Sequence, residues 1–272
     1  MNEPAQPQSS LLRRVITGLL LSVATLAMIW LGVIPFAIQV LVLAGFGLDE
    51  YFGMAEKKGL RPARSLGKIA GMVILVGAVF LSEAQLTRLL MVAIISICVV
   101  IVLRSRDYVS TFLAGSSTVL GVVYLGWMFS FIILLRRLDH GAALVTLLVV
   151  ASAFTDMGGY FIGRWLGRIK LYPTVSPKKT VEGSLGAVVF ALAACWWVGA
   201  WLSIAPIHRF GLGLLVAVVG QLGDLFESAL KRDVGVKDSG TVIAGHGGAL
   251  DRFDSLTFSS PLFYLYAVTF AL

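Results

Sequence analysis

The chain has 272 residues, of which 58% are hydrophobic and only 14% are charged, and its formal net charge is +7. Soluble domains carry about a quarter of their residues as charge, so this composition excludes a soluble globular protein and predicts a polytopic membrane protein. The chain has two cysteines, Cys98 and Cys195, and both lie in apolar stretches. So few cysteines exclude a disulfide framework and a cysteine-rich metal site.

Long apolar runs follow one another along the whole chain. About 20 apolar residues cross the hydrocarbon core of a bilayer as a helix. This rule predicts an all-α fold with nine transmembrane helices, at 13–31, 33–52, 66–82, 86–104, 112–135, 140–163, 183–204, 207–230 and 255–272. Two predicted loops, 164–182 and 231–254, are longer than the others, and long loops in a compact protein are often functional.

The distribution of lysine and arginine predicts which ends of the helices face the cytoplasm. All of these residues lie at the N-terminus or in the even-numbered loops, except Arg88, Arg136, Arg137 and Arg209. By the positive-inside rule, the N-terminus and both longer loops are expected on the cytoplasmic face. The basic charge is then explained by topology, so no nucleic-acid partner is needed.

Several carboxylates fall inside the predicted helices, close to their cytoplasmic ends. Asp156, Asp224, Asp49 and Glu50 lie at similar depth, the depth of phospholipid headgroups. Acidic side chains within membrane helices are costly and usually face an aqueous cavity or a partner. We therefore expect a polar pocket that opens to the cytoplasm. For Asp49 and Glu50 the alternative is that a helix end simply becomes polar at the interface.

The segment GDLFESALKRD carries a polar stripe on an otherwise apolar helix. Asp224, Glu227, Ser228 and Lys231 are spaced i, i+3, i+4 and i+7, so they share one helical face. Such a stripe, running inward from the end of a membrane helix, predicts that this face lines a site.

A glycine-rich segment with two aspartates, GHGGALDRFD, follows this stripe. Gly247 and Gly248 permit close backbone approach and leave N–H groups for an anion, and Asp251 and Asp254 come next. Aspartates with cations nearby suit a magnesium–phosphate site, because Mg²⁺ prefers oxygen ligands and shares substrate phosphates. The pair Lys178-Lys179 in SPKKTVEG could complete it, although a lysine pair in a cytoplasmic loop also serves as a topology determinant.

Three glycines, Gly159, Gly163 and Gly167, recur every four residues. Helix packing and close approach of a ligand explain this spacing equally well. A GxxxxGK[ST] sequence is absent, which excludes a P-loop.

The segment 228–254 closely resembles the signature of the phosphatidate cytidylyltransferases, also called CDP-diacylglycerol synthases. The matching positions are Ser228, Lys231-Arg232, Lys237-Asp238, Ser239, His246-Gly247-Gly248 and Asp251-Arg252-Phe253-Asp254. GDLFES (223–228), SPKKTVEG (176–183) and the stretch 156–160 also look like family motifs. Met157 departs from the threonine that the family often has, so a hydrogen bond from that hydroxyl is not expected here.

The resemblance implies a nucleotidyltransferase of phospholipid biosynthesis that condenses CTP with phosphatidic acid to give CDP-diacylglycerol and pyrophosphate. It also implies a Mg²⁺ requirement, allows a second cation, and places the site at the cytoplasmic face of the inner membrane, among membrane lipids. The small-residue helix faces are compatible with a homodimer. We divide this one membrane unit into N-terminal transmembrane helices (1–110) and a C-terminal catalytic region (111–272).

Roles are assigned to matching residues as hypotheses. The metal ligands are Asp224, Asp251 and Asp254. The catalytic residues are Asp224, Asp251, Lys231 and Arg232. The substrate-binding residues are Asp156, Lys178, Lys179, Glu182, Glu227, Ser228, Lys237, His246, Gly247, Gly248 and Arg252.

Two other functions remain open at this point. A CTP-dependent polyprenol or phytol kinase would transfer the γ-phosphate, but the complete signature series favours the cytidylyltransferase. A transporter predicts inverted repeats and charges near the bilayer midplane, whereas the acidic residues here cluster at one interface and no repeat is visible.

Overall fold

A computed structural model of the chain describes residues 11–104, 111–240, 242 and 247–272. Almost all of this part is helical, as predicted. The helices are α1 (Leu11–Leu31), α2 (Val33–Lys57), α3 (Arg64–Phe80), α4 (Glu83–Arg104), α5 (Thr111–Gly121), the π-helix η2 (Val122–Met128), α6 (Phe129–Arg136), α7 (Gly141–Trp165), α8 (Val181–Trp201), α9 (Pro206–Asp233), the 3₁₀-helix η3 (Leu250–Arg252) and α10 (Asp254–Thr269).

Each of the nine predicted apolar segments falls on a helix, and α5, η2 and α6 together form one of them. Within the described residues, six helical segments are long and apolar enough to cross a membrane: α2, α4, the α5–α6 stretch, α7, α8 and α9. Helices α3 and α10 have 17 and 16 residues, shorter than a typical span. The chain is therefore a multi-pass membrane protein, and the full count of nine spans stays a prediction.

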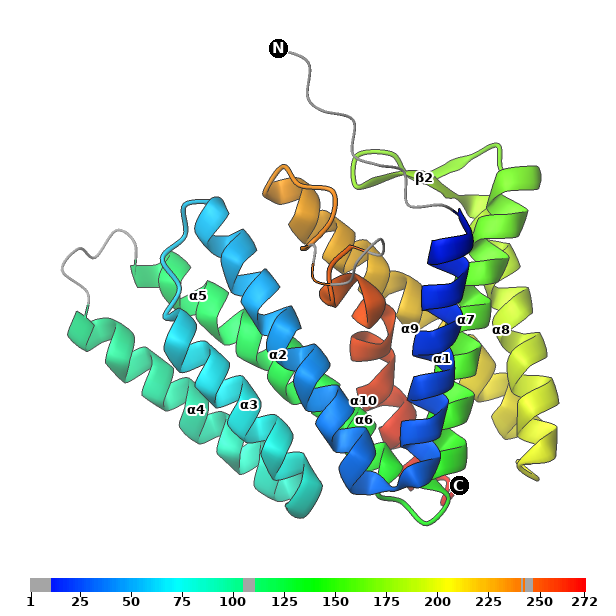
Figure 1. Cartoon of the computed structure of the whole chain (residues 1–272), viewed down its shortest axis with the longest axis horizontal. Coiled ribbons are helices and arrows are strands. Elements are labelled where there is room, and N and C mark those ends of the chain that lie inside the picture. The colour runs from blue at the N-terminus through cyan, green and yellow to red at the C-terminus, as the bar shows by residue number, and fades with distance from the viewer. Residues whose placement is uncertain (1–10, 105–110, 241, 243–246) are drawn as a thin grey trace.

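The loop predicted at 164–182 contains a β-hairpin that the sequence analysis did not predict. Strand β1 (Lys170–Tyr172) pairs antiparallel with β2 (Ser176–Thr180), with Lys170 opposite Thr180 and Tyr172 opposite Ser176. Strands of three and five residues are too short to show a convincing alternation of apolar and polar residues. The hairpin projects from the bundle beside the start of α8 (Figure 1).

The connections between helices separate the molecule into two ends. The hairpin, the segment between α9 and η3, and the turn between α2 and α3 all lie at one end, at the top of Figure 1. The turns between α3 and α4, between α6 and α7, and between α8 and α9 lie at the other end. Both longer loops are therefore at the same end, which we call the polar end.

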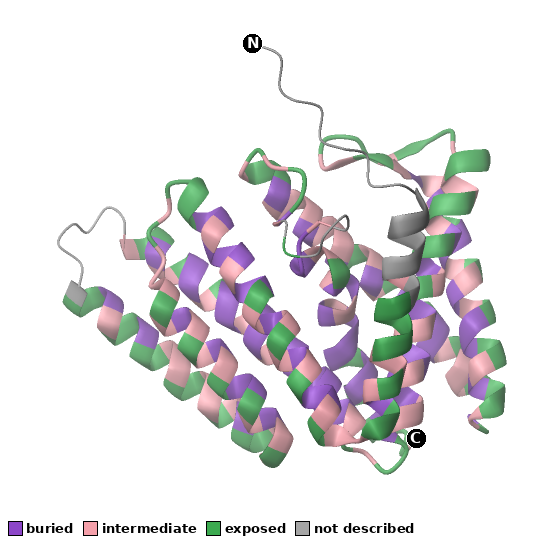
Figure 2. Cartoon of the chain, viewed as in Figure 1, coloured by how far each residue is buried: buried purple, intermediate pink, exposed green. Residues whose placement is uncertain are grey.

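The interior of the bundle is apolar, and much of the exterior is apolar too. One cluster of buried apolar side chains extends from Ile29 in α1 to Ala267 in α10. Figure 2 shows exposed residues along α4, where Ile95, Val102 and Leu103 are 63%, 66% and 79% exposed. Large side chains of this kind would be unfavourable in water, and lipid is the solvent that suits them.

Helices α7 and α8 approach each other closely through glycines. A Cβ atom on Gly158 would lie 2.6 Å from the carbonyl oxygen of Gly186, and one on Gly183 would lie 2.9 Å from that of Gly159. A Cβ atom on Gly163 would be 3.4 Å from the Cα of Gly183. The repeated glycines of α7 therefore serve helix packing, and Gly159 and Gly163 also line the cavity described below.

This packing predicts that Gly158→Ala lowers the thermal stability of the purified protein. The added methyl group collides with the backbone of α8, and overpacking of this kind costs about 1–3 kcal/mol. Gly53→Ala in α2 is a matched control, because a Cβ atom there has no neighbour within 4 Å. The control should melt at an unchanged or higher temperature, since alanine is the better helix former. Equal melting temperatures for the two variants would contradict the close packing.

Candidate active site

A cavity of about 630 Å³ lies at the polar end, between the hairpin and helices α7, α8 and α9. A volume of this size is typical of small-molecule sites. We call it the hairpin cavity. Its polar lining residues are Thr155, Asp156, Tyr160, Arg164, Lys170, Lys178, Lys179, Thr180, Ser184, Gln221 and Asp224. The predicted site residues Asp156 of α7, Lys178 and Lys179 of β2, and Asp224 of α9 are thus brought together from three elements.

The walls of the hairpin cavity carry more positive than negative charge. Lys179 Nζ lies 2.7 Å from Asp224 Oδ2 as an ion pair, and Ser228 Oγ donates a hydrogen bond of 3.3 Å to Asp224 Oδ1. Arg164 and Lys170 also line the cavity, and the guanidinium of Arg164 donates to the hydroxyl of Tyr160 at 2.7 Å. Such a surface suits a polyanionic ligand. The sequence analysis counted Arg164 and Lys170 only as charges that determine topology.

Glu182 lies at the base of the hairpin and does not line the cavity. Its carboxylate accepts hydrogen bonds from the backbone N–H groups of Arg168 (3.1 Å) and Ile169 (3.2 Å). Thr180 caps the start of α8 by accepting from the N–H of Gly183 at 3.1 Å. These bonds fix the angle between the hairpin and α8, so Glu182 holds the lysine-bearing strand in place.

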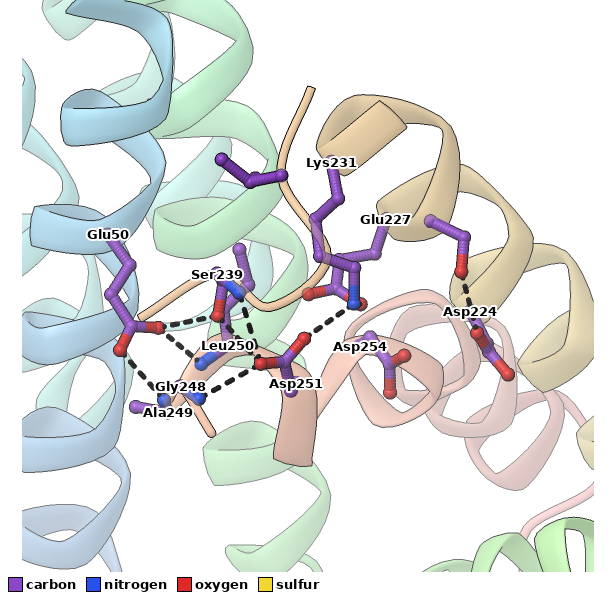
Figure 3. A network of polar contacts seen from close by, with 12 residues as sticks. Glu50, Asp224, Glu227, Lys231, Ser239, Gly248, Ala249, Leu250, Asp251 and Asp254 are labelled. Carbon is purple, nitrogen blue, oxygen red and sulfur yellow. Dashed lines mark hydrogen bonds and ion pairs between the residues drawn. The ribbon is translucent and has the colours of Figure 1, made fainter. Parts of the chain in front are cut away.

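A second polar cluster lies between α9, η3 and α2 (Figure 3). We call it the carboxylate network, and its members are Glu50, Glu227, Lys231, Ser239 and Asp251. Lys231 Nζ donates to Glu227 Oε2 at 2.7 Å and to Asp251 Oδ1 at 2.5 Å. The Glu227 side chain is only 1% exposed. The polar stripe on α9 therefore has two halves: Asp224, to which Ser228 donates, lines the hairpin cavity, whereas Glu227 and Lys231 are buried in the network.

Asp251 is held by donors on both carboxylate oxygens. Its Oδ2 accepts hydrogen bonds from the Ser239 N–H (3.2 Å), the Ser239 hydroxyl (3.1 Å) and the Gly248 N–H (2.9 Å). Burial raises the pKa of Asp251, but the hydrogen bond and charge of Lys231 outweigh this effect, so the pKa lies below its ordinary value. Asp251 is therefore a carboxylate, fixed in orientation, at neutral pH.

Glu50 joins the network from the N-terminal part of the chain. Its carboxylate accepts hydrogen bonds of 2.9 Å from the Ser239 hydroxyl and from the backbone N–H groups of Ala249 and Leu250. The preceding residue, Asp49, instead forms ion pairs with Arg64 (2.9 Å) and Lys68 (2.7 Å) at a 40% exposed position. Only Asp49 fits the interpretation of a helix end that becomes polar, whereas Glu50 is buried within the carboxylate network.

Asp254 begins α10 and lies between the two clusters. The N–H of Ser255 donates to its Oδ1 at 2.7 Å, and the charges of Asp224 and Asp156 repel it. Across the described residues, no three histidine, cysteine or acidic side chains form a ready metal cluster. A Mg²⁺ ion that shares substrate phosphates needs only one or two carboxylates. Asp224, Asp251 and Asp254 supply more carboxylates than this requirement, and a cation at Asp224 or Asp251 would have to displace the lysine that pairs with it, Lys179 or Lys231.

The remaining predicted residues lie around these clusters. Arg232 donates to the carbonyl oxygens of Val175 (3.3 Å) and Val236 (3.0 Å), so it ties the hairpin to the segment after α9. Lys237 and Arg252 are exposed. His246 lies outside the described residues.

The two described glycines of the signature have different tasks. Gly247 has a φ of 83°, which favours glycine, and a Cβ atom on Gly248 would collide with the Ser239 hydroxyl. The N–H group of Gly248, expected to be open to an anionic ligand, instead binds Asp251, and the N–H groups of Ala249 and Leu250 bind Glu50.

The carboxylate network predicts a large cost for removing its lysine. Lys231→Met leaves Glu227 and Asp251 buried without their cation, and breaking a buried pair in this way costs about 3–5 kcal/mol. Lys58→Met is the matched control, because Lys58 pairs with Asp233 where the side chains are 41% and 64% exposed. Exposed pairs contribute about 0–1 kcal/mol. Thermal melts should show a clear loss for Lys231→Met alone; a similar small shift for both would refute the buried network.

A family profile and several known proteins match almost the whole chain. The profile of the cytidylyltransferase family matches residues 12–270. A phosphatidate cytidylyltransferase of Bacillus subtilis (strain 168) is 35% identical over 272 residues, which cover 95% of this chain and 98% of the relative. One from Synechocystis is 35% identical over 292 residues, with coverage of 94% and 96%. One from Staphylococcus aureus (strain COL) is 30% identical over 256 residues, with coverage of 92% and 96%.

Proposed function

Because the chain belongs to the cytidylyltransferase family, and is thus a nucleotidyltransferase, we propose that it condenses CTP with phosphatidic acid to CDP-diacylglycerol and pyrophosphate. One observation carries this proposal. The hairpin cavity places lysines and an arginine opposite Asp156 and Asp224, next to the segment that bears the signature aspartates. A soluble polyanion and a lipid phosphate can meet at such a place.

The proposed reaction forms one P–O bond and breaks another. A phosphatidate oxygen attacks the α-phosphorus of CTP, the bond from that phosphorus to the bridging oxygen breaks, and its electron pair leaves with pyrophosphate. Little covalent chemistry falls to the protein in such transfers, so positioning and charge neutralisation supply most of the rate.

The lysines of the hairpin cavity would bind the triphosphate. Strand β2 carries Lys178 and Lys179, and Glu182 fixes its position. Lys179 forms an ion pair with Asp224. Asp224 and Asp254 would hold Mg²⁺, which neutralises phosphate charge when bound. Asp251 is the third proposed ligand, and in the structure it is oriented by Lys231, Ser239 and Gly248.

We further propose that the polar end faces the cytoplasm, where CTP is available, with the chain in the inner membrane. The charge distribution supports this orientation. The glycines of α7 pack against α8 within the chain, so they give no support to the predicted homodimer. The homodimer stays a prediction that a mass measurement in detergent would test.

The reaction is tested by pyrophosphate release from the purified protein. Release should require CTP, phosphatidic acid and Mg²⁺ together. Asp224→Asn should lower kcat by about 100-fold or more, because loss of one group that stabilises transition-state charge costs about 10²–10³. Asp233→Asn is the control, since Asp233 pairs with Lys58 on an exposed surface away from the cavity. Near-normal turnover by Asp224→Asn would refute its role as a metal ligand.

The same assay separates the reaction from that of a lipid kinase. Formation of CDP with a supplied lipid alcohol, and no pyrophosphate, would replace the proposed function by γ-phosphate transfer.

The assignment of the triphosphate to the hairpin cavity makes a separate prediction. Lys178→Met removes a cation that lines the cavity and should raise the KM for CTP by about tenfold or more, since hydrogen bonds to charged groups contribute about 1.5–3 kcal/mol. Lys57→Met, at the end of α2 and outside the cavity, is the control and should leave KM unchanged. An equal KM for CTP in the two variants would contradict the assignment of the triphosphate to this cavity.

A further inference from the structure

The N-terminal part of the chain reaches the signature segment through one buried side chain. Glu50 of α2 is 8% exposed, and the groups that it binds lie 189 to 200 residues later in the sequence. One carboxylate accepts hydrogen bonds from Ser239 and from Ala249 and Leu250, which are two separate points of the signature segment 228–254 (Figure 3). Glu50 therefore holds these two points of the segment together.

The backbone around Glu50 leaves no room for other side chains. A Cβ atom on Gly248 would lie 2.6 Å from Glu50 Oε2, and one on Gly240 would lie 2.7 Å from Glu50 Cδ. The chain wraps directly around the carboxylate, which explains why glycine occupies both positions. The segment therefore encloses the Glu50 carboxylate. Water molecules could not take over its role as hydrogen-bond acceptor unless the backbone of the segment moved.

Helix α2 touches the segment at a second point, one turn earlier. A Cβ atom on Gly47 would lie 2.6 Å from the ring of Phe253, so the ring rests against the backbone of α2. A face of that ring stacks on Phe129, with the ring centroids 4.5 Å apart. Phe253 stands between Asp251 and Asp254 in the sequence, so α2 contacts the aspartate-bearing turn on both sides of Asp251.

The contacts of Glu50 set the orientation of Asp251. The N–H groups of Ala249 and Leu250 are at the start of η3, the short helix that carries Asp251. The Ser239 hydroxyl bridges the two carboxylates, at 2.9 Å from Glu50 Oε2 and 3.1 Å from Asp251 Oδ2. If Glu50 could not accept these bonds, η3 and its aspartate would lose their fixed position, while the hairpin cavity would keep all of its walls.

We propose that Glu50 is a positioning residue for the reaction: it acts through Ser239 and η3 to aim Asp251 and the start of α10 at the substrates. This inference rests on the proposed function for its kinetic part only. A shift of about 1 Å in a reacting geometry can cost about 100-fold in rate. The residue should therefore affect kcat rather than the binding of CTP.

Glu50→Gln tests the proposal, with Asp49→Asn as the matched control. Glutamine keeps the shape of the side chain, but its NH₂ group faces backbone N–H donors from which it cannot accept. Asp49→Asn changes a carboxylate in the adjacent position whose ion pairs are with Arg64 and Lys68 of α3. The first measurement is hydrogen–deuterium exchange of peptides that cover 247–253, because it requires no activity. Exchange there should be faster in Glu50→Gln and unchanged in Asp49→Asn.

The second measurement is steady-state kinetics of pyrophosphate release. Glu50→Gln should lower kcat by about 10- to 100-fold with the KM for CTP within about twofold of the parent value. A KM change without a kcat change, or unchanged exchange over 247–253, would overturn the proposal. If Glu50→Gln does not fold, Ser239→Ala, which keeps the carboxylate and removes one donor, should show a smaller change of the same kind, and no change would equally overturn it.

These two measurements distinguish a failure of the proposed function from a failure of the proposed role of Glu50. A parent protein that releases no pyrophosphate would refute the proposed function, and the exchange comparison would still decide whether Glu50 anchors η3.

Discussion

The polar end of this membrane protein depends on one ammonium group placed between two buried carboxylates. Lys231 bonds to Glu227 and to Asp251, and none of the three side chains is more than 11% exposed. Removing such charges from water is costly unless each finds a partner. The lysine provides that partner for two acids at once, and this fixes the distance between α9, which carries Glu227, and η3, which carries Asp251.

This constraint leaves α9 with two distinct faces. Asp224, which Ser228 hydrogen-bonds, lines the hairpin cavity, whereas Glu227 and Lys231 belong to the carboxylate network with Asp251 of η3. The cations that can receive phosphate are on the first side, on the hairpin and α7. The groups that orient the signature aspartates are on the second. The two faces of α9 thus belong to different clusters, and under the proposed function a substitution on either face should have its own kinetic signature.

The sequence predicts those features that depend on near neighbours. Apolar runs predict each helix, because about 20 apolar residues are enough to require a membrane or a core. The polar stripe on α9 and the signature segment are also local patterns. The hairpin was missed because its strands are very short, and the pairing of Lys179 with Asp224 joins strand β2 to helix α9, which are far apart in the chain. No local pattern contains that information.

Glu50 shows where local information ends. Asp49 and Glu50 are adjacent acids in the same helix, and from the sequence they have the same interpretation. Adjacent residues point about 100° apart around a helix of 3.6 residues per turn. This rotation sends Asp49 to the basic residues of α3 and Glu50 to the backbone of η3. Only the packing of α2 against Phe253, a contact between distant parts of the chain, decides which acid is buried.

The glycines of the signature segment have a physical role other than the expected one. Glycine and free N–H groups near a helix start commonly form an anion site, and the sequence suggested that a substrate phosphate would use it. In the structure the anions are carboxylates of the chain itself: Gly248 N–H binds Asp251, and Ala249 and Leu250 bind Glu50. These hydrogen bonds from backbone N–H groups to an anion hold acidic side chains of the chain in place rather than bind a ligand. Under the proposed function, phosphate recognition then falls to cationic side chains, of which Arg164, Lys170, Lys178 and Lys179 line the hairpin cavity.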